Sequence, residues 1–121
     1  MLNLDTHVLL HAVVGTLTAR EESLLRGDRW SISAIVLWEI AKLAQIGRIA
    51  IDLEDPEVVR VLSAIHVWPI TREIAVASTR LDVSSDPADE LIAATSLVHG
   101  VALVTRDRRM RRSKLVPLAQ R

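Results

Sequence analysis

Short apolar runs alternate along this chain with longer apolar stretches of helical period, a pattern typical of strands followed by helices. Strand-like runs occupy residues 2–4, 30–33, 67–70 and 101–104. The fourth run is apolar throughout, as in strands that are buried on both faces. A fifth run, residues 115–118, contains Pro117, which has no N–H to donate, so it predicts a last strand at the edge of the sheet.

Start and stop signals divide the intervening stretches into helices. Thr18 and Glu21 have the spacing of a capping box, which predicts a helix over residues 19–26. Asp-Pro pairs at residues 55–56 and 86–87 predict two more helix starts, with Pro in the first turn where its missing N–H costs nothing. The remaining helices are expected over the apolar stretches that end at a glycine or begin at Thr71: residues 6–14, 34–46, 72–81 and 87–99.

This alternation predicts an α/β domain of three layers, with helices on both faces of a mainly parallel sheet of four to five strands. The 121 residues are enough for one domain and leave no room for a second. No internal repeat, low-complexity segment or linker interrupts the pattern. We therefore expect a single domain over residues 1–121.

The composition narrows the choice of partners. Half the residues are apolar, and there are three Trp but no Phe or Tyr. So few aromatic residues argue against a platform on which nucleic-acid bases stack. A mean hydropathy of +0.27 is high for a small monomer, which indicates that a partner or a second copy covers part of the apolar surface.

Charge is balanced overall but clustered at the C-terminal end. Fifteen basic and fifteen acidic residues cancel, so the net charge neither favours nor excludes nucleic acid. Residues 106–121 hold seven Lys or Arg against the single acid Asp107. Two interpretations stay open for this segment: a solvated, slightly disordered end, or a patch that contacts phosphates.

Several features favour a soluble cytoplasmic protein with no membrane contact. The chain has no cysteine, which excludes disulfides and thiolate chemistry. Its first residues lack the basic start and long apolar run of a signal peptide. The longest uncharged stretch near the C-terminal end, residues 91–105, is too short to cross a bilayer.

Acidic residues stand where the predicted strands end or the predicted helices begin. Asp5 ends the first strand, Asp107 follows the fourth, Glu39 lies in the second turn of one helix and Asp89 in the first turn of another. Ligands of parallel sheets bind outside the carboxyl ends of the strands, so these four carboxylates are expected to converge there. Such a cluster would repel itself unless a cation neutralised it, which predicts a divalent-metal site.

Each acid also has a local interpretation. Asp5 and Asp107 can cap the turns that follow them, and Asp89 can interact with the dipole of its helix, capped by Asp86. Glu39 can lie on a solvated helix face. His7 and His11 have the i, i+4 spacing of a helical metal pair, but no acid stands beside the first His as zinc hydrolysis requires. His7 is expected to shape the pocket entrance.

Four motifs in a fixed order carry a family resemblance, and together they extend over nearly the whole chain. They are Leu4-Asp5-Thr6-His7-Val8-Leu9-Leu10; Ser33-Ala34 with Leu37-Trp38-Glu39-Ile40-Ala41; Asp86-Pro87-Ala88-Asp89 with Leu91-Ile92-Ala93-Ala94-Thr95; and Leu103-Val104-Thr105-Arg106-Asp107. In this order they resemble the PIN-domain family, and most closely the VapC-type toxins of type II toxin–antitoxin systems.

The resemblance implies an endoribonuclease that depends on Mg²⁺ or Mn²⁺ and cleaves RNA with a metal-activated water. It also implies a homodimer and a cognate antitoxin that covers an apolar groove, with Leu9, Ala12 and the apolar positions of residues 34–46 as possible contacts. The implied catalytic and metal-binding residues are Asp5, Glu39, Asp89 and Asp107. The implied supporting residues are Thr6, Ser33, Asp86 and Thr105. The first candidates for holding the RNA backbone are Arg106, Arg108 and Arg109.

One departure keeps other functions open. Where many relatives have Arg after the third acid, this chain has Glu90. A weakly active or inactive PIN-like binding domain is therefore an alternative. A receiver-type signalling module would also place acids at the strand ends, but it wants a Lys after a late strand. A haloacid-dehalogenase-like phosphatase would want a second Asp at the position of His7.

Overall fold

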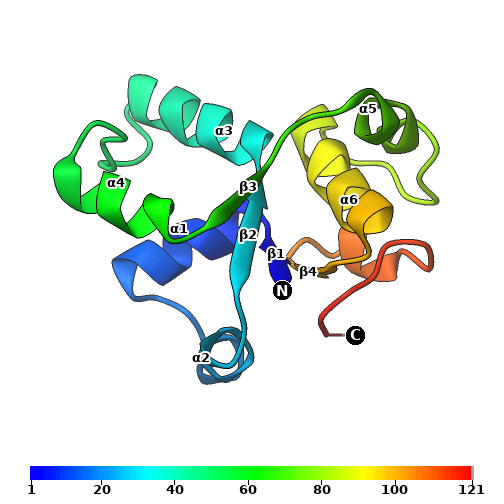
Figure 1. Ribbon diagram of the computed structural model, residues 1–121, viewed down its shortest axis with the longest axis horizontal. Coiled ribbons are helices and arrows are strands. Elements are labelled where there is room, and N and C mark those ends of the chain that lie inside the picture. The colour runs from blue at the N-terminus through cyan, green and yellow to red at the C-terminus, as the bar shows by residue number, and fades with distance from the viewer. Residues whose placement is uncertain (121) are drawn as a thin grey trace.

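A parallel sheet of four strands lies at the centre of the computed structural model, which describes residues 1–120 (Figure 1). The strands are β1 (Leu2–Leu4), β2 (Trp30–Ser33), β3 (His66–Trp68) and β4 (Ala102–Val104). Their spatial order is β3-β2-β1-β4, and every pairing is parallel. The order reverses between β1 and β4, so the crevice at which such sheets bind ligands should open there.

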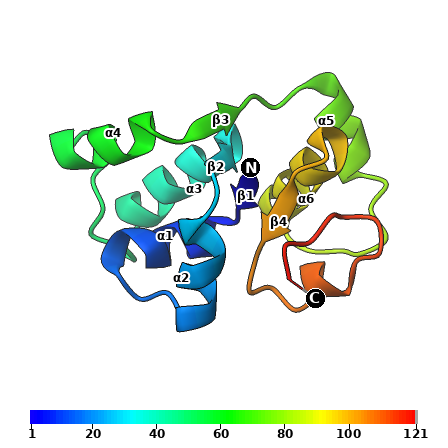
Figure 2. The same ribbon diagram turned by 60° about the horizontal axis from the view of Figure 1, so that its bottom comes forward.

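Helices cover both faces of the sheet and complete the three predicted layers. Figures 1 and 2 show α1, α3 and α4 on one side and α5 and α6 on the other. The six helices are α1 (Thr6–Val14), α2 (Ala19–Arg26), α3 (Ala34–Gln45), α4 (Pro56–Ser63), α5 (Arg72–Ser78) and α6 (Pro87–His99). Within residues 1–120, no helix combines the length and apolar character needed to cross a membrane.

Local capping signals explain why several boundaries fall where the sequence predicts them. Thr18 and Glu21 form the complete capping box at the start of α2. Gly15 and Gly100 end α1 and α6 in the left-handed conformation, with φ of 78° and 65°, which glycine adopts without steric cost. These boundaries depend only on neighbouring residues.

The structure differs from the prediction at β3, which ends at Trp68 and not at residue 70, in the run over residues 115–118, and at the end of the helix that follows Thr71. The run over residues 115–118 is not a strand: Leu118 forms one isolated parallel bridge with Leu103, and Pro117 contributes only its carbonyl, which accepts from Leu103 N at 2.8 Å. The helix expected to reach residue 81 ends at Ser78. There the hydroxyls of Ser78 and Thr79 donate to Ala75 O and Val76 O, so they compete with the helical backbone.

The C-terminal segment packs against the domain through its apolar residues and is ordered over residues 106–120, while its described Lys and Arg side chains are exposed to solvent. Met110, in the short 3₁₀ helix η1 (Met110–Arg112), and Val116 are both fully buried in the core. Arg121, the last member of the basic cluster, lies outside the described residues. The core beneath is mainly aliphatic and includes Leu4, Val8, Leu9, Ile32, Val36, Ile92, Leu103 and Val104.

One buried polar side chain ties the central strand to α6. Asn3 is fully buried, and its Nδ2 donates to Ile92 O at 3.1 Å and to Ser96 Oγ at 2.9 Å. We expect Asn3→Ala to lower the free energy of unfolding by about 1–3 kcal/mol, because it leaves buried acceptors unpaired. Urea denaturation would measure this, with Ser96→Ala as the control that removes only one of the two bonds. A loss no larger than that of the control would contradict the prediction.

Candidate active site

The site lies at the reversal point of the sheet, where the chain leaves β1 and β4. Asp5 follows β1 directly, and its backbone N donates to Val104 O at 3.0 Å. Thr105 follows β4, and its hydroxyl donates to Asp5 Oδ2 at 2.6 Å. Both side chains are buried, Asp5 with 6 % exposure and Thr105 with 2 %. Parallel pairing of the two strands therefore places residues 100 positions apart in direct contact.

The two carboxylate oxygens of Asp107 have different hydrogen-bond partners. Its Oδ1 accepts from the backbone N of Arg109 at 2.8 Å and so caps the turn that leads to η1, as the local interpretation predicts. Its Oδ2 lies 3.3 Å from the hydroxyl of Ser85. The same hydroxyl lies 3.0 Å from Asp89 Oδ2, so Ser85 bridges the acid on α6 and the acid after β4.

Glu39 reaches the site from α3. Its Oε1 accepts a short hydrogen bond from the hydroxyl of Thr6, the residue next to Asp5. Ser33 determines where α3 begins, because its buried hydroxyl accepts from Ile35 N at 3.2 Å as the N-cap. Each of the four predicted acids is thus joined to a hydroxyl: Asp5 to Thr105, Glu39 to Thr6, and Asp89 and Asp107 to Ser85.

Burial and the charges of neighbouring carboxylates raise the pKa of Asp5, Glu39 and Asp89. Burial is the main cause of the raised pKa of Asp89, about 6, and the carboxylates of Asp5, Glu39 and Asp107 add to it. Burial likewise raises the pKa of Asp5 and of Glu39, against the lowering effect of their hydroxyl donors. Each of these three acids therefore resists ionisation unless positive charge enters the site.

The cluster fits a hard divalent cation, although within residues 1–120 no three acidic or histidine side chains already form a complete ligand set. Asp5 Oδ1 is buried and has no hydrogen-bond partner, so one carboxylate oxygen of the cluster is left uncompensated. Mg²⁺ usually binds through one or two carboxylates and retains several waters, so a complete protein cage is not required. The residues that would hold such an ion are Asp5 and Asp89, with Glu39 and Asp107 beside them.

Asp86 and the two histidines play smaller parts than their sequence positions allow. Asp86 occupies the N-cap position of α6, but its side chain makes no capping hydrogen bond; its charge contributes to the raised pKa of Glu39. His7 is exposed. His11 uses both ring nitrogens, with Nδ1 at 2.6 Å from Thr16 Oγ1 and Nε2 at 3.0 Å from Arg106 Nη1, so it is directed away from a metal pair with His7.

The three arginines predicted to hold RNA differ in their surroundings. Arg108 and Arg109 are exposed beside Asp107. Arg106 instead makes an ion pair with Glu21 at 2.6 Å. A phosphate could reach its guanidinium only by replacing this partner.

Two functional candidates escape prediction from the sequence. Ser85 lies four residues before Asp89, and a hydroxyl just ahead of a helix start is too common to indicate a bridge to Asp107. Glu21 is fully explained locally by its capping box, which hides its second contact with Arg106. Glu90 accepts from Ser85 N at 3.3 Å and so helps to hold the bridging serine.

Comparison with known proteins agrees with this geometry. The family model of the PIN domain matches residues 3–114. Ribonuclease VapC22 of Mycobacterium tuberculosis is 36 % identical over 97 residues, which are 77 % of this chain and 74 % of the relative.

Solved structures share the fold. VapBC2 from Rickettsia felis, bound to a DNA fragment from its promoter, matches with a TM-score of 0.72 at 18 % identity over 98 % of this chain and 97 % of the other. A toxin–antitoxin complex from Klebsiella pneumoniae matches with a TM-score of 0.71 at 20 % identity, covering 93 % and 91 %. At these identities the structures establish the fold alone.

The raised pKa of Asp89 predicts that this carboxylate opposes folding when no cation is present. A raised pKa means that the stability contributed by the protonated group is lost as the pH rises from about 4 to about 6. At pH 7.5 in EDTA, we expect Asp89→Asn to raise the free energy of unfolding by of order 1 kcal/mol. Added Mg²⁺ should raise the melting temperature of the wild type more than that of the variant.

Glu90→Gln is the matched control, because it removes the same charge from the same helical turn. It should leave stability in EDTA nearly unchanged. If Asp89→Asn were less stable than this control at pH 7.5, the electrostatic description of the site would be wrong.

Proposed function

Because this chain belongs to the PIN-domain family, we propose that it is an Mg²⁺- or Mn²⁺-dependent endoribonuclease and the toxin of a type II toxin–antitoxin pair. A ribonuclease relative at 36 % identity supports RNA hydrolysis as the reaction class. The observation that carries the proposal for this chain is the gathering of Asp5, Glu39, Asp89 and Asp107 around three hydroxyls at the reversal point of the sheet.

Each residue has a distinct part in the proposed reaction. Thr105 fixes Asp5 through its Oδ2 and leaves Oδ1 without a partner, and Thr6 fixes Glu39 through its Oε1. Ser85 keeps Asp89 and Asp107 together. Burial raises the pKa of Asp89 to about 6, close to neutral pH, which suits this carboxylate to take a proton from the attacking water.

A bound Mg²⁺ or Mn²⁺ would supply a Lewis acid and offset the negative charge that develops on the phosphodiester. Hard carboxylate oxygens favour these ions over softer metals. The four acids alone would repel the RNA backbone, so neutralisation supports substrate binding as well as chemistry. Arg108 and Arg109, exposed beside Asp107, are the better placed of the three predicted arginines to contact phosphates.

The presence of all four acids also helps to choose among the alternative functions, namely an inactive PIN-like domain, a receiver module and a phosphatase. An inactive PIN-like domain has no need to keep four acids in contact with dedicated hydroxyls. Glu90 acts here as an acceptor for the Ser85 backbone, which is compatible with an active site. Family membership removes the basis for a receiver module or a haloacid-dehalogenase-like phosphatase.

Cleavage of RNA tests the reaction directly. We expect the purified chain to cut total tRNA or ribosomal RNA into discrete products with Mg²⁺ or Mn²⁺ and to be inactive in EDTA. Asp5→Asn and Asp89→Asn should each lower the rate at least a hundredfold while the circular dichroism spectrum stays unchanged, because each removes a carboxylate that would hold the ion. Equal cleavage by the wild type and both variants would contradict the mechanism.

An apolar groove supports the antitoxin part of the proposal. It has a volume of about 220 Å³ and lies between α1, α3 and α4, with Leu9, Leu10, Val13, Ile40, Val58 and Leu62 among its lining residues. Two of the predicted contact regions, Leu9 and the helix over residues 34–46, contribute to it, whereas Ala12 is not among the lining residues. We propose that an apolar segment of the antitoxin binds there.

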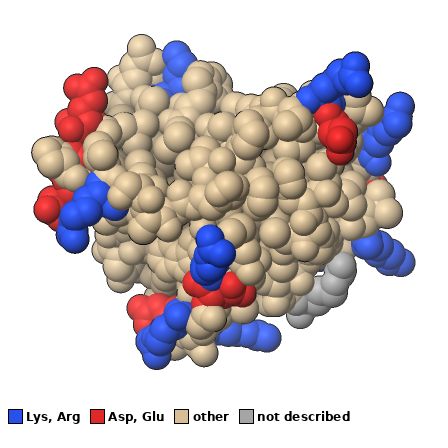
Figure 3. Space-filling model, viewed as in Figure 1, with Lys and Arg blue, Asp and Glu red and all other residues tan. Residues whose placement is uncertain are grey.

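We propose that a second copy of this chain covers another part of the surface, as the family resemblance implies. Figure 3 shows a face whose middle carries few charged side chains, with Lys, Arg, Asp and Glu mostly around its margin. Several large apolar residues are well exposed, among them Trp38 at 55 % and Ile46 at 61 %. Large exposed apolar side chains such as these are candidates for burial in a protein interface.

A charge placed in the groove should separate antitoxin binding from catalysis. Val13 is 41 % exposed at the groove, so Val13→Glu should fold normally yet weaken co-purification with the cognate antitoxin at least tenfold, since a carboxylate would be buried without a partner. Cleavage of RNA by the variant should stay unchanged. Val76→Glu, an equally exposed valine on α5, is the control. Equal antitoxin binding by both variants would exclude the groove.

A further inference from the structure

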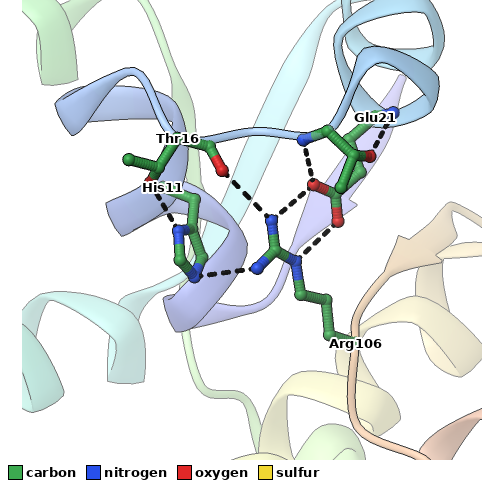
Figure 4. Close-up of polar contacts among 5 residues, drawn as sticks. His11, Thr16, Glu21 and Arg106 are labelled. Atoms are coloured by element: carbon green, nitrogen blue, oxygen red, sulfur yellow. Dashed lines mark hydrogen bonds and ion pairs between the residues drawn. The ribbon is translucent and has the colours of Figure 1, made fainter.

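An ion pair outside the acidic cluster joins α2 to the loop after β4, next to the site. Glu21 lies on α2 and Arg106 lies on the loop after β4, 85 positions later (Figure 4). The pairing is two-pronged: Arg106 Nε donates to Glu21 Oε2 at 2.7 Å, and Nη2 donates to Oε1 at 2.6 Å. Paired, parallel bonds of this kind fix both the distance and the plane of the guanidinium.

Glu21 is buried and held in position for its contact with Arg106. Its side chain is only 5 % exposed, whereas that of Arg106 is 37 % exposed. The hydrogen bond from Arg106 is the main cause that lowers the pKa of Glu21 to about 2, so the carboxylate is charged throughout the physiological range. Thr18 holds the same carboxylate through its backbone N at 2.9 Å, so the acceptor is fixed before the arginine arrives.

The remaining donors of Arg106 reach the end of α1. Its Nη1 donates to His11 Nε2 at 3.0 Å, and Nη2 lies 3.4 Å from Thr16 O (Figure 4). Because an arginine only donates, Nε2 of His11 must accept, and the ring proton therefore sits on Nδ1, facing Thr16 Oγ1. Arg106 is thus attached to α1, α2 and the turn between them.

The residues on either side of Arg106 are members of the site. Thr105 donates to Asp5 Oδ2, and Asp107 N donates back to Thr105 Oγ1 at 3.0 Å. Asp107 in turn faces Ser85 and Asp89. A displacement of Arg106 would therefore move Thr105, which donates to Asp5, and Asp107, which shares the hydroxyl of Ser85 with Asp89.

From this geometry we infer that Glu21 and Arg106 form a clasp that positions Thr105 and Asp107 for catalysis, rather than a binding point for RNA. The inference rests on the proposed ribonuclease function for its kinetic consequence, but the clasp itself is a property of the fold. Glu21 and Arg106 are positioning residues, because they act on the site through Thr105 and Asp107.

Replacing each partner separates the two roles that Arg106 could have. If the clasp positions the site, Glu21→Gln and Arg106→Gln should each lower kcat for RNA cleavage at least tenfold and change KM less than twofold, because a small misplacement of reacting groups is costly. The double variant should be no slower than the slower single variant, since both changes break the same interaction. If Arg106 contacts RNA instead, Arg106→Gln should raise KM, and Glu21→Gln, which frees the guanidinium, should lower it.

A stability control separates positioning from general destabilisation. Ile74→Val truncates a fully buried side chain on α5, away from the clasp. All variants should be compared at a temperature at which circular dichroism shows each to be folded. A kcat of Ile74→Val close to that of the wild type, beside the tenfold losses above, supports the clasp. An equal loss in this control would overturn it.

Hydrogen exchange tests the clasp without any activity. The amide of Asp107, which donates to Thr105 Oγ1, should exchange at least tenfold faster in Glu21→Gln than in the wild type, while that of Leu103 in β4 should change little. Unchanged exchange at Asp107 would overturn the inference even if the wild type cleaves RNA. If the wild type cleaves no RNA, the proposed function fails, and the exchange rate alone decides whether the clasp holds the loop.

Discussion

The mutual repulsion of carboxylates gathered at one edge of a parallel sheet is the constraint on which the rest of this structure depends. Asp5, Glu39 and Asp89 are each partly or fully withdrawn from water, and each has a raised pKa because of burial and of its acidic neighbours. Such an arrangement opposes folding unless hydrogen bonds hold it and a cation completes it. This cost falls where the strand order reverses and a ligand can enter.

The fold supplies the support that the cluster needs. β1 and β4 deliver Asp5 and Thr105 side by side, while α3 and α6 bring Glu39 and Asp89 from opposite faces of the sheet. Hydroxyl donors lie between the acids, and Asn3 joins the central strand to the helix that carries Asp89. Beyond this inner set, the clasp between Glu21 and Arg106 fixes the loop after β4 from outside. The positive charge of Arg106 thus holds this loop in place, next to an acidic site that would otherwise attract it.

Most of the fold, and the placement of the four acids near one edge of the sheet, could be predicted from the sequence because both depend on local signals. Capping residues such as Thr18 and helix-ending glycines such as Gly15 depend on a few neighbours, and the order of acids after strands follows from the alternation of elements. What could not be predicted depends on contacts between distant positions. The bridge made by Ser85 to Asp107 and the pairing of Glu21 with Arg106 join residues 22 and 85 positions apart, and each residue alone has an adequate local explanation. The failed edge strand at residues 115–118 has the same origin, since one bridge to Leu103 satisfies it.

The most direct test of this account is a pH titration of the side-chain carboxyls of Asp5, Glu39 and Asp89 by ¹³C NMR, in EDTA and in saturating Mg²⁺. The account predicts that all three titrate above the ordinary range without the ion, Asp89 near pH 6, and that Mg²⁺ moves their titrations to lower pH. An Asp89 that titrates near pH 4 in EDTA, or titrations that Mg²⁺ leaves unchanged, would contradict the claim that this cluster is held ready for a divalent cation.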